Sequence, residues 1–374
     1  MLSLKEYIAT QQHPLIMAFG NPLLDTIVIN DNNRLKPLMD RLRLEVDGIV
    51  ELDRKQMQDI FKSLPEDLPR TTAAGGSSLN SMRFLQKLIG SGDQRVCTYF
   101  GAIGNDEHGK LLKELLEAAK IDARLGVVSN YPTGMTLAIV TNENRSLVAH
   151  IGAAGKYNKL KYVEDTLPLD RIKILYIEAY FLINNFCVAI EIAKMAESKK
   201  FLIAFNLNAE YVLEKHEREI LDFIAYSNIV FGNVGEYQAL AARYPIEYDR
   251  PTDIPFHLNT MAAVGRDWEH KCGRSWLSRS SCFVLSQGGN GPAICVYGEN
   301  NFVEYKIPTN ITVKDTTGAG DALVAGFLAG VLAGQEPQTC LNWGCKVAEE
   351  VIQKLGATLP DDLPDDFLPL TPQK

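Results

Sequence analysis

The segment Lys314-Asp-Thr-Thr-Gly-Ala-Gly-Asp-Ala-Leu-Val-Ala-Gly-Phe-Leu328 decides the fold, because its character changes in the middle. Just ahead of it, Ile311 and Val313 alternate with polar residues, as at the end of a strand. Its second half opens an almost wholly apolar run, 322–332, which is long enough for about three helical turns. A turn with two glycines and one acid therefore joins a predicted strand to a predicted buried helix.

This turn has the composition of an anion site. The first N–H groups of a helix lack partners inside the helix, and glycines let a ligand approach the backbone closely. Together with the positive end of the helix dipole, such groups attract anions. Asp321 stands where the predicted helix begins. Its carboxylate is either a helix cap or a base directed at the bound molecule, and the local sequence leaves both interpretations open.

The composition of the chain excludes several classes of protein. Its 374 residues suit one large α/β domain with an appendage, or two domains. A net charge of −8 without a basic block argues against nucleic acid as a partner. The first 13 residues lack the apolar core of a signal peptide, and the longest apolar run is too short to cross a bilayer. The seven cysteines form no C-x-x-C pair, which indicates a reduced, cytoplasmic protein without a zinc site.

From about residue 172 onward, predicted strands alternate with predicted helices. The strands are Ile174–Ile177, Phe201–Phe205, Ile229–Phe231, Cys282–Leu285 and Ala293–Val296, and the helices are Cys187–Ser198, Val212–Ala225 and Gly235–Arg243. This rhythm predicts parallel pairing with right-handed crossovers, and near-continuous apolar strands are typical of a sheet covered on both faces. We therefore expect an α/β fold with a doubly wound, mostly parallel sheet. Residues 245–280 are predicted to form an irregular connection.

Three features in the first half of the chain have both an ordinary and a functional interpretation. Gly20-Asn-Pro-Leu-Leu-Asp25 follows an apolar strand, and the small residues 71–78 precede a predicted helix at 79–88. Arg145 lies in a polar turn between two β-rich runs, 135–140 and 146–151. The ordinary interpretations are an Asx turn, a flexible loop and an exposed hairpin arginine. Each of them remains open from the local sequence.

Polar residues follow four of the apolar strands, where ligands bind in doubly wound sheets. These tips are Asn206/Asn208, Asn233/Glu236, 286–289 and 315–321, and together they indicate a polyanionic ligand. Asn233 and Glu236 suit a Mg²⁺ ion held mostly through water, or else form a helix start whose acid stabilises the dipole. No P-loop motif is present, and the glycine pattern at 318–323 departs from the dinucleotide fingerprint, which disfavours a dehydrogenase.

Several of these motifs carry a family resemblance. Asp315 to Leu328 matches the C-terminal signature of the PfkB (ribokinase-like) family of carbohydrate and nucleoside kinases, and Asn233-x-x-Glu236 is similar to its magnesium-linked motif. Gly20–Asp25, Asn144–Leu147 and Ile352–Pro360 resemble the branch of the family that phosphorylates adenosine. The resemblance implies a ribokinase-like fold with a small β-rich lid. The implied large domain is 1–25, 51–130 and 152–374, and the implied lid is 26–50 and 131–151.

The resemblance also implies a reaction, in which the γ-phosphoryl group of MgATP passes to the 5′-hydroxyl of adenosine to give AMP and ADP, as in purine salvage. Asp321 would be the general base, and the N–H groups of Gly318, Ala319 and Gly320 would hold the charge on the moving phosphoryl group. Arg145 would close over the phosphates. The implied substrate-binding residues are Asn21, Asp25, Gly75, Gly76, Asn80, Leu147, Ala149 and Phe181. The implied residues for the cofactors ATP and Mg²⁺ are Asn233, Glu236, Ser286, Gly288, Thr317 and Cys345, with Glu236 linked to the metal through water.

The chain departs from the family pattern at five positions, namely Ala74, Glu178, Glu210, Thr317 and Cys345. None of the five replaces Asp321, the glycines beside it or the Asn233/Glu236 pair, so phosphoryl-transfer chemistry is expected. Another nucleoside or sugar kinase is the first alternative, and a catalytically silent nucleotide-binding protein is the second. We expect a monomer with small-molecule substrates, without nucleic acid or membrane partners, in the cytoplasm and with the nucleus open as a second location.

Overall fold

The computed structural model describes residues 2–46, 48–141, 144–158, 163, 167–244, 246–262, 277, 281–364 and 366–370. Of the predicted connection 245–280, residues 245, 263–276 and 278–280 lie outside the described residues. The part that is described includes a helix, α12 (Ile254–Ala262), which the sequence did not predict.

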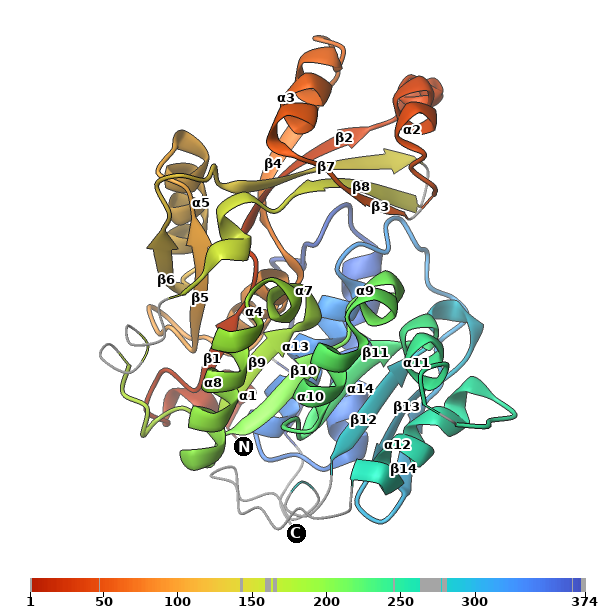
Figure 1. Cartoon of the computed structure of the whole chain (residues 1–374). Helices are drawn as coiled ribbons and strands as arrows, with labels where there is room; N and C mark the ends of the chain where they lie inside the picture. Colours follow the sequence, from red (N-terminus) through yellow and green to blue (C-terminus); the bar gives the residue numbers. More distant parts are fainter. Residues whose placement is uncertain are drawn as a thin grey trace.

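A nine-stranded sheet forms the centre of the molecule, in the order β14-β13-β12-β11-β10-β9-β1-β5-β6 (Figure 1). All neighbours from β12 to β6 pair in parallel, and β13 and β14 add antiparallel strands at one edge. The strands are β1 (Ile16–Phe19), β5 (Cys97–Ile103), β6 (Asp122–Val127), β9 (Ile174–Glu178), β10 (Leu202–Asn206), β11 (Ile229–Asn233), β12 (Cys282–Ser286), β13 (Ala293–Tyr297) and β14 (Asn301–Tyr305). The predicted mostly parallel α/β sheet is confirmed.

Two hydrophobic cores cover the two faces of this sheet, because successive side chains of a strand point to opposite faces. In β9, Ile174 and Tyr176 enter one core, and Leu175 and Ile177 enter the other. The first core is covered by α1 (Leu4–Ala9), α4 (Ser77–Ile89), α5 (Glu107–Ala118), α13 (Ala319–Leu332) and α14 (Pro337–Ile352). The second is covered by α7 (Ala179–Asn184), α8 (Phe186–Ser198), α9 (Glu210–Lys215), α10 (Glu217–Ile224), α11 (Val234–Ala241) and α12.

One predicted helix is two in the structure. The sequence predicted a single helix over 212–225, but α9 ends at Lys215 and α10 begins at Glu217. The backbone of His216 between them has φ −130° and ψ 38°, which lies outside the helical region and breaks the run.

A second, five-stranded sheet lies over the carboxyl ends of the parallel strands of the first (Figure 1). Its strand order is β3-β8-β7-β2-β4. Its strands are β2 (Leu23–Ile29), β3 (Ile49–Glu51), β4 (Arg70–Gly75), β7 (Gly134–Thr141) and β8 (Asn144–His150). Helices α2 (Lys36–Leu42) and α3 (Arg54–Ser63) cover its outer face and share a separate core with it, including Val28, Ile60 and Ile139. This small sheet is the predicted lid.

The lid differs in detail from the expected β-rich segments 26–50 and 131–151. Helix α2 forms within the first segment, with Pro37 in its first turn and Leu38 and Leu42 packed on the core of the lid. Strand β4 and helix α3 also join this unit, although the expected large domain included both. We therefore propose that the lid comprises residues 23–75 and 134–150.

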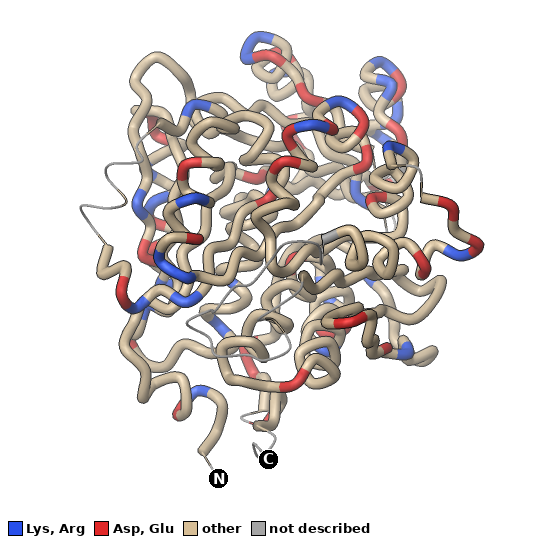
Figure 2. The backbone as a smooth tube through the Cα atoms, turned by 60° about the horizontal axis from the view of Figure 1, so that its bottom comes forward, with Lys and Arg blue, Asp and Glu red and all other residues tan. Residues whose placement is uncertain are grey.

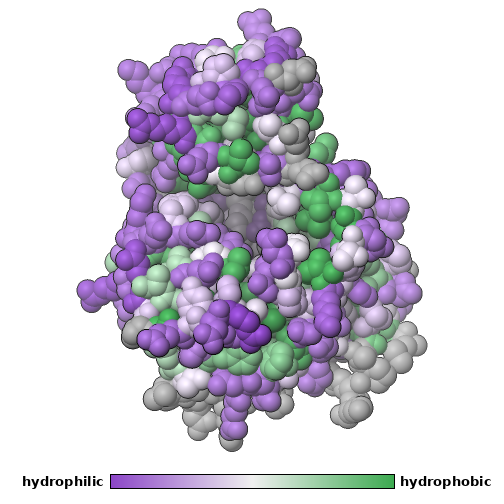
Figure 3. Space-filling model, turned by 90° about the vertical axis from the view of Figure 1, so that its right-hand side faces the viewer, coloured by the Kyte–Doolittle hydropathy of each residue, from purple (hydrophilic) through white to green (hydrophobic). Residues whose placement is uncertain are grey.

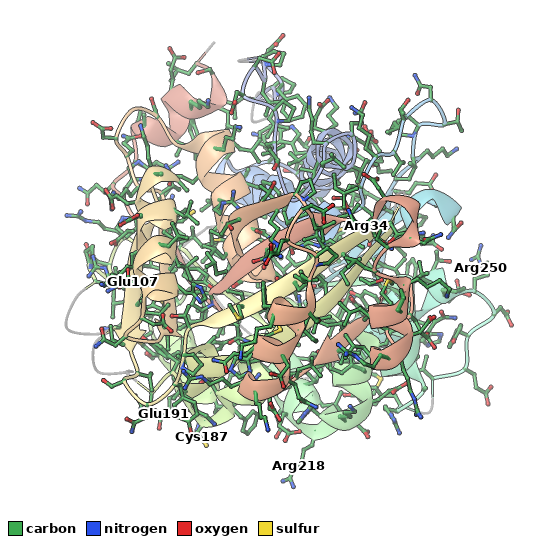
Figure 4. The ribbon with its side chains drawn as sticks, turned by 90° about the horizontal axis from the view of Figure 1, so that it is seen from above. Arg34, Glu107, Cys187, Glu191, Arg218 and Arg250 are labelled. Carbon is green, nitrogen blue, oxygen red and sulfur yellow. The ribbon has the colours of Figure 1, made fainter. Side chains whose placement is uncertain are left out.

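An ion pair connects two segments of the lid, and other charged side chains are distributed over the molecule. Arg34, seen over the small sheet in Figure 4, pairs with Asp67 at 2.7 Å and so links the turn before α2 to the segment before β4. Along the backbone in Figure 2, lysines and arginines are interspersed with acidic residues. Within the described part of the chain, no helix has both the length and the apolar composition that a membrane span requires.

The strand predicted just ahead of the glycine turn, at Ile311 and Val313, is not observed, since β14 ends at Tyr305 and residues 306–318 form no strand or helix. Helix α13 is buried from Asp321 to Leu332, as the apolar run predicted. It lies against α14 so closely that a Cβ atom on Gly326 would stand 2.5 Å from the carbonyl oxygen of Trp343.

We expect Gly326→Ala to lower the free energy of unfolding by about 1–3 kcal/mol, because the two helix backbones must separate. Denaturant titration measures this. Gly289→Ala, whose Cβ would meet no atom within 4 Å, is the matched control, and equal midpoints for the two variants would contradict the prediction.

Candidate active site

The ends of four neighbouring strands form one wall of a cavity between the two sheets. The registers place Glu178 of β9 beside Asn206 of β10, and Asn233 of β11 beside Ser286 of β12. At about 4.8 Å per strand, this row is roughly 15 Å long. The cavity measures about 430 Å³, and Figure 3 shows the molecule hollowed between its two parts. A ligand as long as a nucleoside joined to phosphates could lie along this row.

The glycine turn before α13 opens into this cavity. Gly318 caps the helix with φ 75°, a left-handed conformation that favours glycine. Asp315 is buried below the turn and accepts hydrogen bonds from the N–H groups of Thr317 (2.8 Å) and Gly356 (2.7 Å), which fix the shape of the turn. Ala319 donates to the Thr316 carbonyl at 3.2 Å. Ala319, one of the three predicted donors, is therefore not available to an anion, whereas among the described residues the N–H groups of Gly318, Gly320 and Asp321 have no acceptor.

The carboxylate of Asp321 does not cap its own helix, since Gly318 occupies the N-cap and no side-chain cap bond forms. Instead, α4 holds it from the opposite side. Ser77 Oγ donates to Oδ1 at 2.7 Å, and Asn80 Nδ2 donates to Oδ2 at 3.1 Å. Burial raises the pKa of Asp321 to about 6, against the two hydrogen bonds and the charge of Arg145, which lower it. A carboxylate with such a pKa, in a cavity and beside free N–H groups, suits a general base near neutral pH.

Asp25 is a second buried carboxylate in the same cavity, but it belongs to the lid. It lies within β2 and accepts hydrogen bonds from Thr136 Oγ1 (2.5 Å) and Arg145 Nη2 (3.1 Å). A Cβ on Gly75 would stand 2.2 Å from this carboxylate, so the glycine makes room for it. Gly76 has φ 101°, and a Cβ there would stand 2.2 Å from the Asn21 carbonyl oxygen. The double glycine thus shapes the wall around Asp25.

Most of the other predicted substrate residues also line the cavity, namely Asn21, Gly76, Asn80, Leu147 and Ala149. Phe181 does not. It is fully buried and packs its ring against Phe19 and Tyr157 in the core of the large sheet. The neighbouring Tyr180 lines the cavity in its place, and its carbonyl accepts a hydrogen bond from Asn21 Nδ2 at 2.9 Å. Successive residues of a helix point about 100° apart, so only one of the two can face the ligand.

Of the residues predicted to bind ATP and Mg²⁺, likewise, some line the cavity and others do not. Asn233, Glu236, Ser286 and Thr317 line the cavity, and Gly288 and Cys345 do not. Gly288 lies in the 3-10 turn η5 (Gly288–Asn290), and a Cβ there would meet open space. Cys345 is buried in α14, and this burial raises the pKa of its thiol.

Asn233 and Glu236 form a capping box at the start of α11, which is the ordinary structural role that the sequence left open. Glu236 N–H donates to Asn233 Oδ1, and the Glu236 carboxylate accepts from the N–H and the Nδ2 of Asn233, all at 2.9 Å. Each carboxylate oxygen keeps a second lone pair. Burial raises the pKa of Glu236 to about 7. Within the described ranges, no group of three or more His, Cys, Asp or Glu residues could enclose a metal ion. This donor set fits a cation bound mostly through water.

Several residues of the cavity escaped the predicted site, and three of them, which lie near Asp321, had a weak signal in the sequence. Ser77 follows the double glycine at the start of α4, and Asn208 belongs to the polar tip after β10. Asn208 Nδ2 donates to Ser77 Oγ at 2.9 Å. Glu178 ends an apolar strand and is only 1% exposed. A charged residue at the end of such a strand is unusual enough to mark it, because buried carboxyl groups are rare.

A doubly wound sheet with a small β lid, and a glycine turn that sets a buried carboxylate at a helix start, define a kinase of the ribokinase-like class. The family model for pfkB family carbohydrate kinases matches residues 42–364. The chain belongs to this family, and the resemblance seen in its motifs is confirmed.

Individual relatives span nearly the whole chain. Adenosine kinase 1 of Arabidopsis thaliana is 24% identical over 350 residues, which cover 93% of this chain and 96% of that protein. Adenosine kinase of Dictyostelium discoideum is 25% identical over 357 residues, covering 93% and 97%. Among solved structures, Anopheles gambiae adenosine kinase in complex with P1,P4-di(adenosine-5) tetraphosphate is 25% identical, with a TM-score of 0.78, covering 97% of this chain and 100% of that one. Schistosoma mansoni adenosine kinase in complex with 2-fluoroadenosine is 26% identical, with a TM-score of 0.78, covering 94% and 98%.

Proposed function

We propose that this protein is an adenosine kinase, which transfers the γ-phosphoryl group of MgATP to the 5′-hydroxyl of adenosine and releases AMP and ADP. One observation carries the proposal. Asp25 and Asp321 face the same cavity but have separate partners, Asp25 in the lid and Asp321 beside an open anion site. Two carboxylates in such different settings suit two tasks, binding a diol and accepting a proton. The four relatives described above are named adenosine kinases, which supports adenosine as the acceptor.

Asp321 would take the proton of the acceptor hydroxyl as its oxygen attacks the γ-phosphorus. Phosphoryl transfer depends on positioning and on stabilising charge, and both needs are met at this turn. The N–H groups of Gly320 and Asp321 would donate to the oxygens of the transferred group, and the dipole of α13 adds to their effect. Arg145 already contacts Asp25 and lowers the pKa of Asp321, so its positive charge lies near both carboxylates. It would also attract the phosphates.

Asp25 would accept hydrogen bonds from the two neighbouring ribose hydroxyls, since an ionised carboxylate has acceptor positions on both oxygens. Thr136 and Arg145 hold the carboxylate in place for this. Leu147 and Ala149 of the lid and Tyr180 of α7 line the same cavity and would enclose the base. These residues come from both parts of the molecule, so binding of the nucleoside would join the lid to the large sheet.

Asn233, Ser286 and Thr317 would bind the phosphates of ATP at the other end of the strand row. Glu236 would bind Mg²⁺ through water with the free lone pairs of its carboxylate. The ion would supply positive charge that neutralises the β- and γ-phosphate oxygens. Hydrogen bonds from Asn233 hold the Glu236 side chain in position for this contact.

A panel of acceptors tests the proposed function. ADP release from MgATP is measured with adenosine, inosine, guanosine, ribose and fructose, and kcat/KM is expected to be highest for adenosine. A free sugar that exceeds adenosine would favour the alternative of another family kinase. Absence of ADP release with every acceptor, while adenosine still binds, would favour a silent nucleotide-binding protein.

A further inference from the structure

Arg83 is a basic residue of α4 that has no role in the proposed mechanism. It does not line the active-site cavity, and its half-buried side chain lines a second cavity of about 410 Å³ instead. Its Nη1 atom donates to the carbonyl oxygen of Ala74 at 2.9 Å and to Asn80 Oδ1 at 3.3 Å. One nitrogen thus connects the end of β4, in the lid, to the helix that holds Asp321.

The orientation of the Asn80 amide depends on its partners at both ends. Nδ2 donates to Asp321 Oδ2 at 3.1 Å, and Oδ1 accepts from Arg83. An ionised carboxylate only accepts and a guanidinium only donates, so both partners require the same orientation of the amide. In the reversed orientation, an oxygen would face Asp321 and an NH₂ group would face Arg83, which is unfavourable at both ends. Among the described residues, Arg83 is the one donor that is hydrogen-bonded to Asn80 Oδ1.

The sequence explains why these groups meet. Asn80 and Arg83 are three positions apart on α4, so they lie on the same face of the helix. The double glycine at 75–76 turns the chain from β4 into α4, which brings the Ala74 carbonyl beside that face. Burial lowers the pKa of Arg83 and the charge of Asp25 opposes this effect, so the two side chains are close enough to interact. Arginine nevertheless stays charged in proteins, so Arg83 remains a donor at every pH of interest.

We propose that Arg83 is a positioning residue, which keeps the Asn80 amide turned with its N–H group toward Asp321 and so orients the carboxylate for phosphoryl transfer. The proposal rests on the proposed role of Asp321 as the base. Without Arg83, Ser77 alone would hold Asp321 whenever the amide turns away. Misorientation of a reacting group slows the chemical step, so the loss is expected in kcat.

A double-mutant cycle in the full-length protein tests this role. The rate constant kcat is measured with MgATP and the best acceptor of the panel for the unchanged protein, Arg83→Met, Asn80→Ala and the double variant. Methionine keeps an apolar stem but donates no hydrogen bond. Arg83→Met should lower kcat by at least about fivefold when Asn80 is present, and by less than about twofold when it is alanine. The second effect is small because no amide remains to be oriented.

Lys87→Met is the matched control. Lys87 lies one turn further along α4 and lines the same second cavity. Its Nζ atom donates to the carbonyl oxygen of Leu359 at 2.7 Å and to Asp361 Oδ1 at 2.6 Å, and neither acceptor belongs to the active-site cavity. Lys87→Met should therefore leave kcat unchanged.

A split between rate and affinity separates positioning from a general loss of structure. Equilibrium binding of adenosine to Arg83→Met, measured without ATP, should change by less than about threefold, because Thr136 and Arg145 still hold Asp25. If Arg83→Met does not fold, Arg83→Lys takes its place in the cycle. The lysine Nζ ends one bond short of the position of Arg83 Nη1, so this variant keeps the charge but should lose the contact with Asn80.

The titration of Asp321 gives a second readout that does not need activity. Infrared spectra follow the neutral carboxyl band that Asp321→Asn removes. Burial raises the pKa of Asp321 to about 6, and the hydrogen bond from Asn80 lowers it. Arg83→Met should therefore raise this pKa by at least about half a pH unit, and the difference should vanish in the Asn80→Ala background. The other groups that face Asp321 are the same in all four proteins, namely Arg145, Asp25, Glu178 and Tyr176.

The outcomes separate this proposal from the proposed function. Equal losses of kcat in the two backgrounds, no loss in Arg83→Met, or an equal loss in Lys87→Met would overturn the role of Arg83. An unchanged titration of Asp321 in Arg83→Met would overturn it too, even in an active enzyme. If no acceptor is phosphorylated, the proposed function fails, and the titration still decides whether Arg83 orients Asn80.

Discussion

Asp321→Asn is expected to lower kcat for adenosine by at least about 10²-fold, and up to about 10⁴-fold. The amide has nearly the same shape as the carboxylate, but it cannot accept the proton of the acceptor hydroxyl. The N–H groups at the start of α13 remain, so residual positioning and charge stabilisation should leave a low rate above that of the uncatalysed reaction. KM for adenosine should change little, since the diol contacts are assigned to Asp25. Steady-state ADP release over a range of adenosine concentrations measures both constants.

The fold of this variant should be intact, and its stability gives an independent check. Burial raises the pKa of Asp321 above its ordinary value, so the native state binds a proton more readily than the unfolded chain does. Its ionisation therefore removes stability as the pH rises through about 6. At pH 7.5 the neutral asparagine should unfold at the same temperature as Asp321 or at a higher one. Asp222→Asn, an exposed position on α10, is the matched control and should leave kcat unchanged. Full activity in Asp321→Asn would remove Asp321 from the role of base.

Asp25→Ala is expected to raise KM for adenosine by at least about 10²-fold. A hydrogen bond to a charged group contributes about 1.5–3 kcal/mol, and Asp25 would make one to each of two ribose hydroxyls. The substitution also removes the carboxylate that Thr136 and Arg145 hold, which loosens the lid wall of the cavity. Equilibrium binding of adenosine, measured without ATP, separates this loss from any change in chemistry.

Two comparisons make the Asp25 result specific. Asp25→Asn keeps one acceptor oxygen and should lose less affinity than Asp25→Ala. Asp59→Ala changes an exposed carboxylate on α3 of the same lid and should leave KM unchanged. Adenosine affinity that survives Asp25→Ala would mean that the diol binds elsewhere, and the orientation of the nucleoside in the cavity would have to be reversed.

Much of the fold could be predicted from local patterns, because they report burial directly. The apolar strands at 174–177, 201–205 and 282–285 are strands β9, β10 and β12, each observed to within one residue at either end. The lid was harder to predict. Helix α2 has only seven residues, and its apolar side chains pack on a core that is completed by the distant strands β7 and β8. The sequence of α2 alone therefore does not show which of its faces is buried. Strand β4 likewise joins the lid only through pairing with β2.

Within the site, too, some residues could be predicted from the sequence and others depend on tertiary packing. The motifs identified Asp25, Arg145 and Asp321, and the structure brings all three to one cavity. The motifs could not indicate that Tyr180 faces that cavity and Phe181 does not. Which of two neighbouring helix residues faces a cavity depends on how α7 packs against the rest of the molecule. The presence of Glu178 in the same cavity as Asp321 also depends on tertiary structure, because β9 and α13 are far apart in the sequence.

By itself, the sequence from Lys314 to Leu328 determined that a glycine turn that can bind an anion leads into a buried helix, whereas the strand predicted ahead of the turn is not observed. This followed from backbone freedom at glycine and from an apolar run too long to be exposed. The role of Asp321 was decided only by tertiary structure. Gly318 occupies the cap position, and Ser77, 244 positions away, orients the carboxylate together with Asn80. Local sequence cannot encode that choice, because the donors that hold the carboxylate and the burial that raises its pKa both come from α4 and the lid.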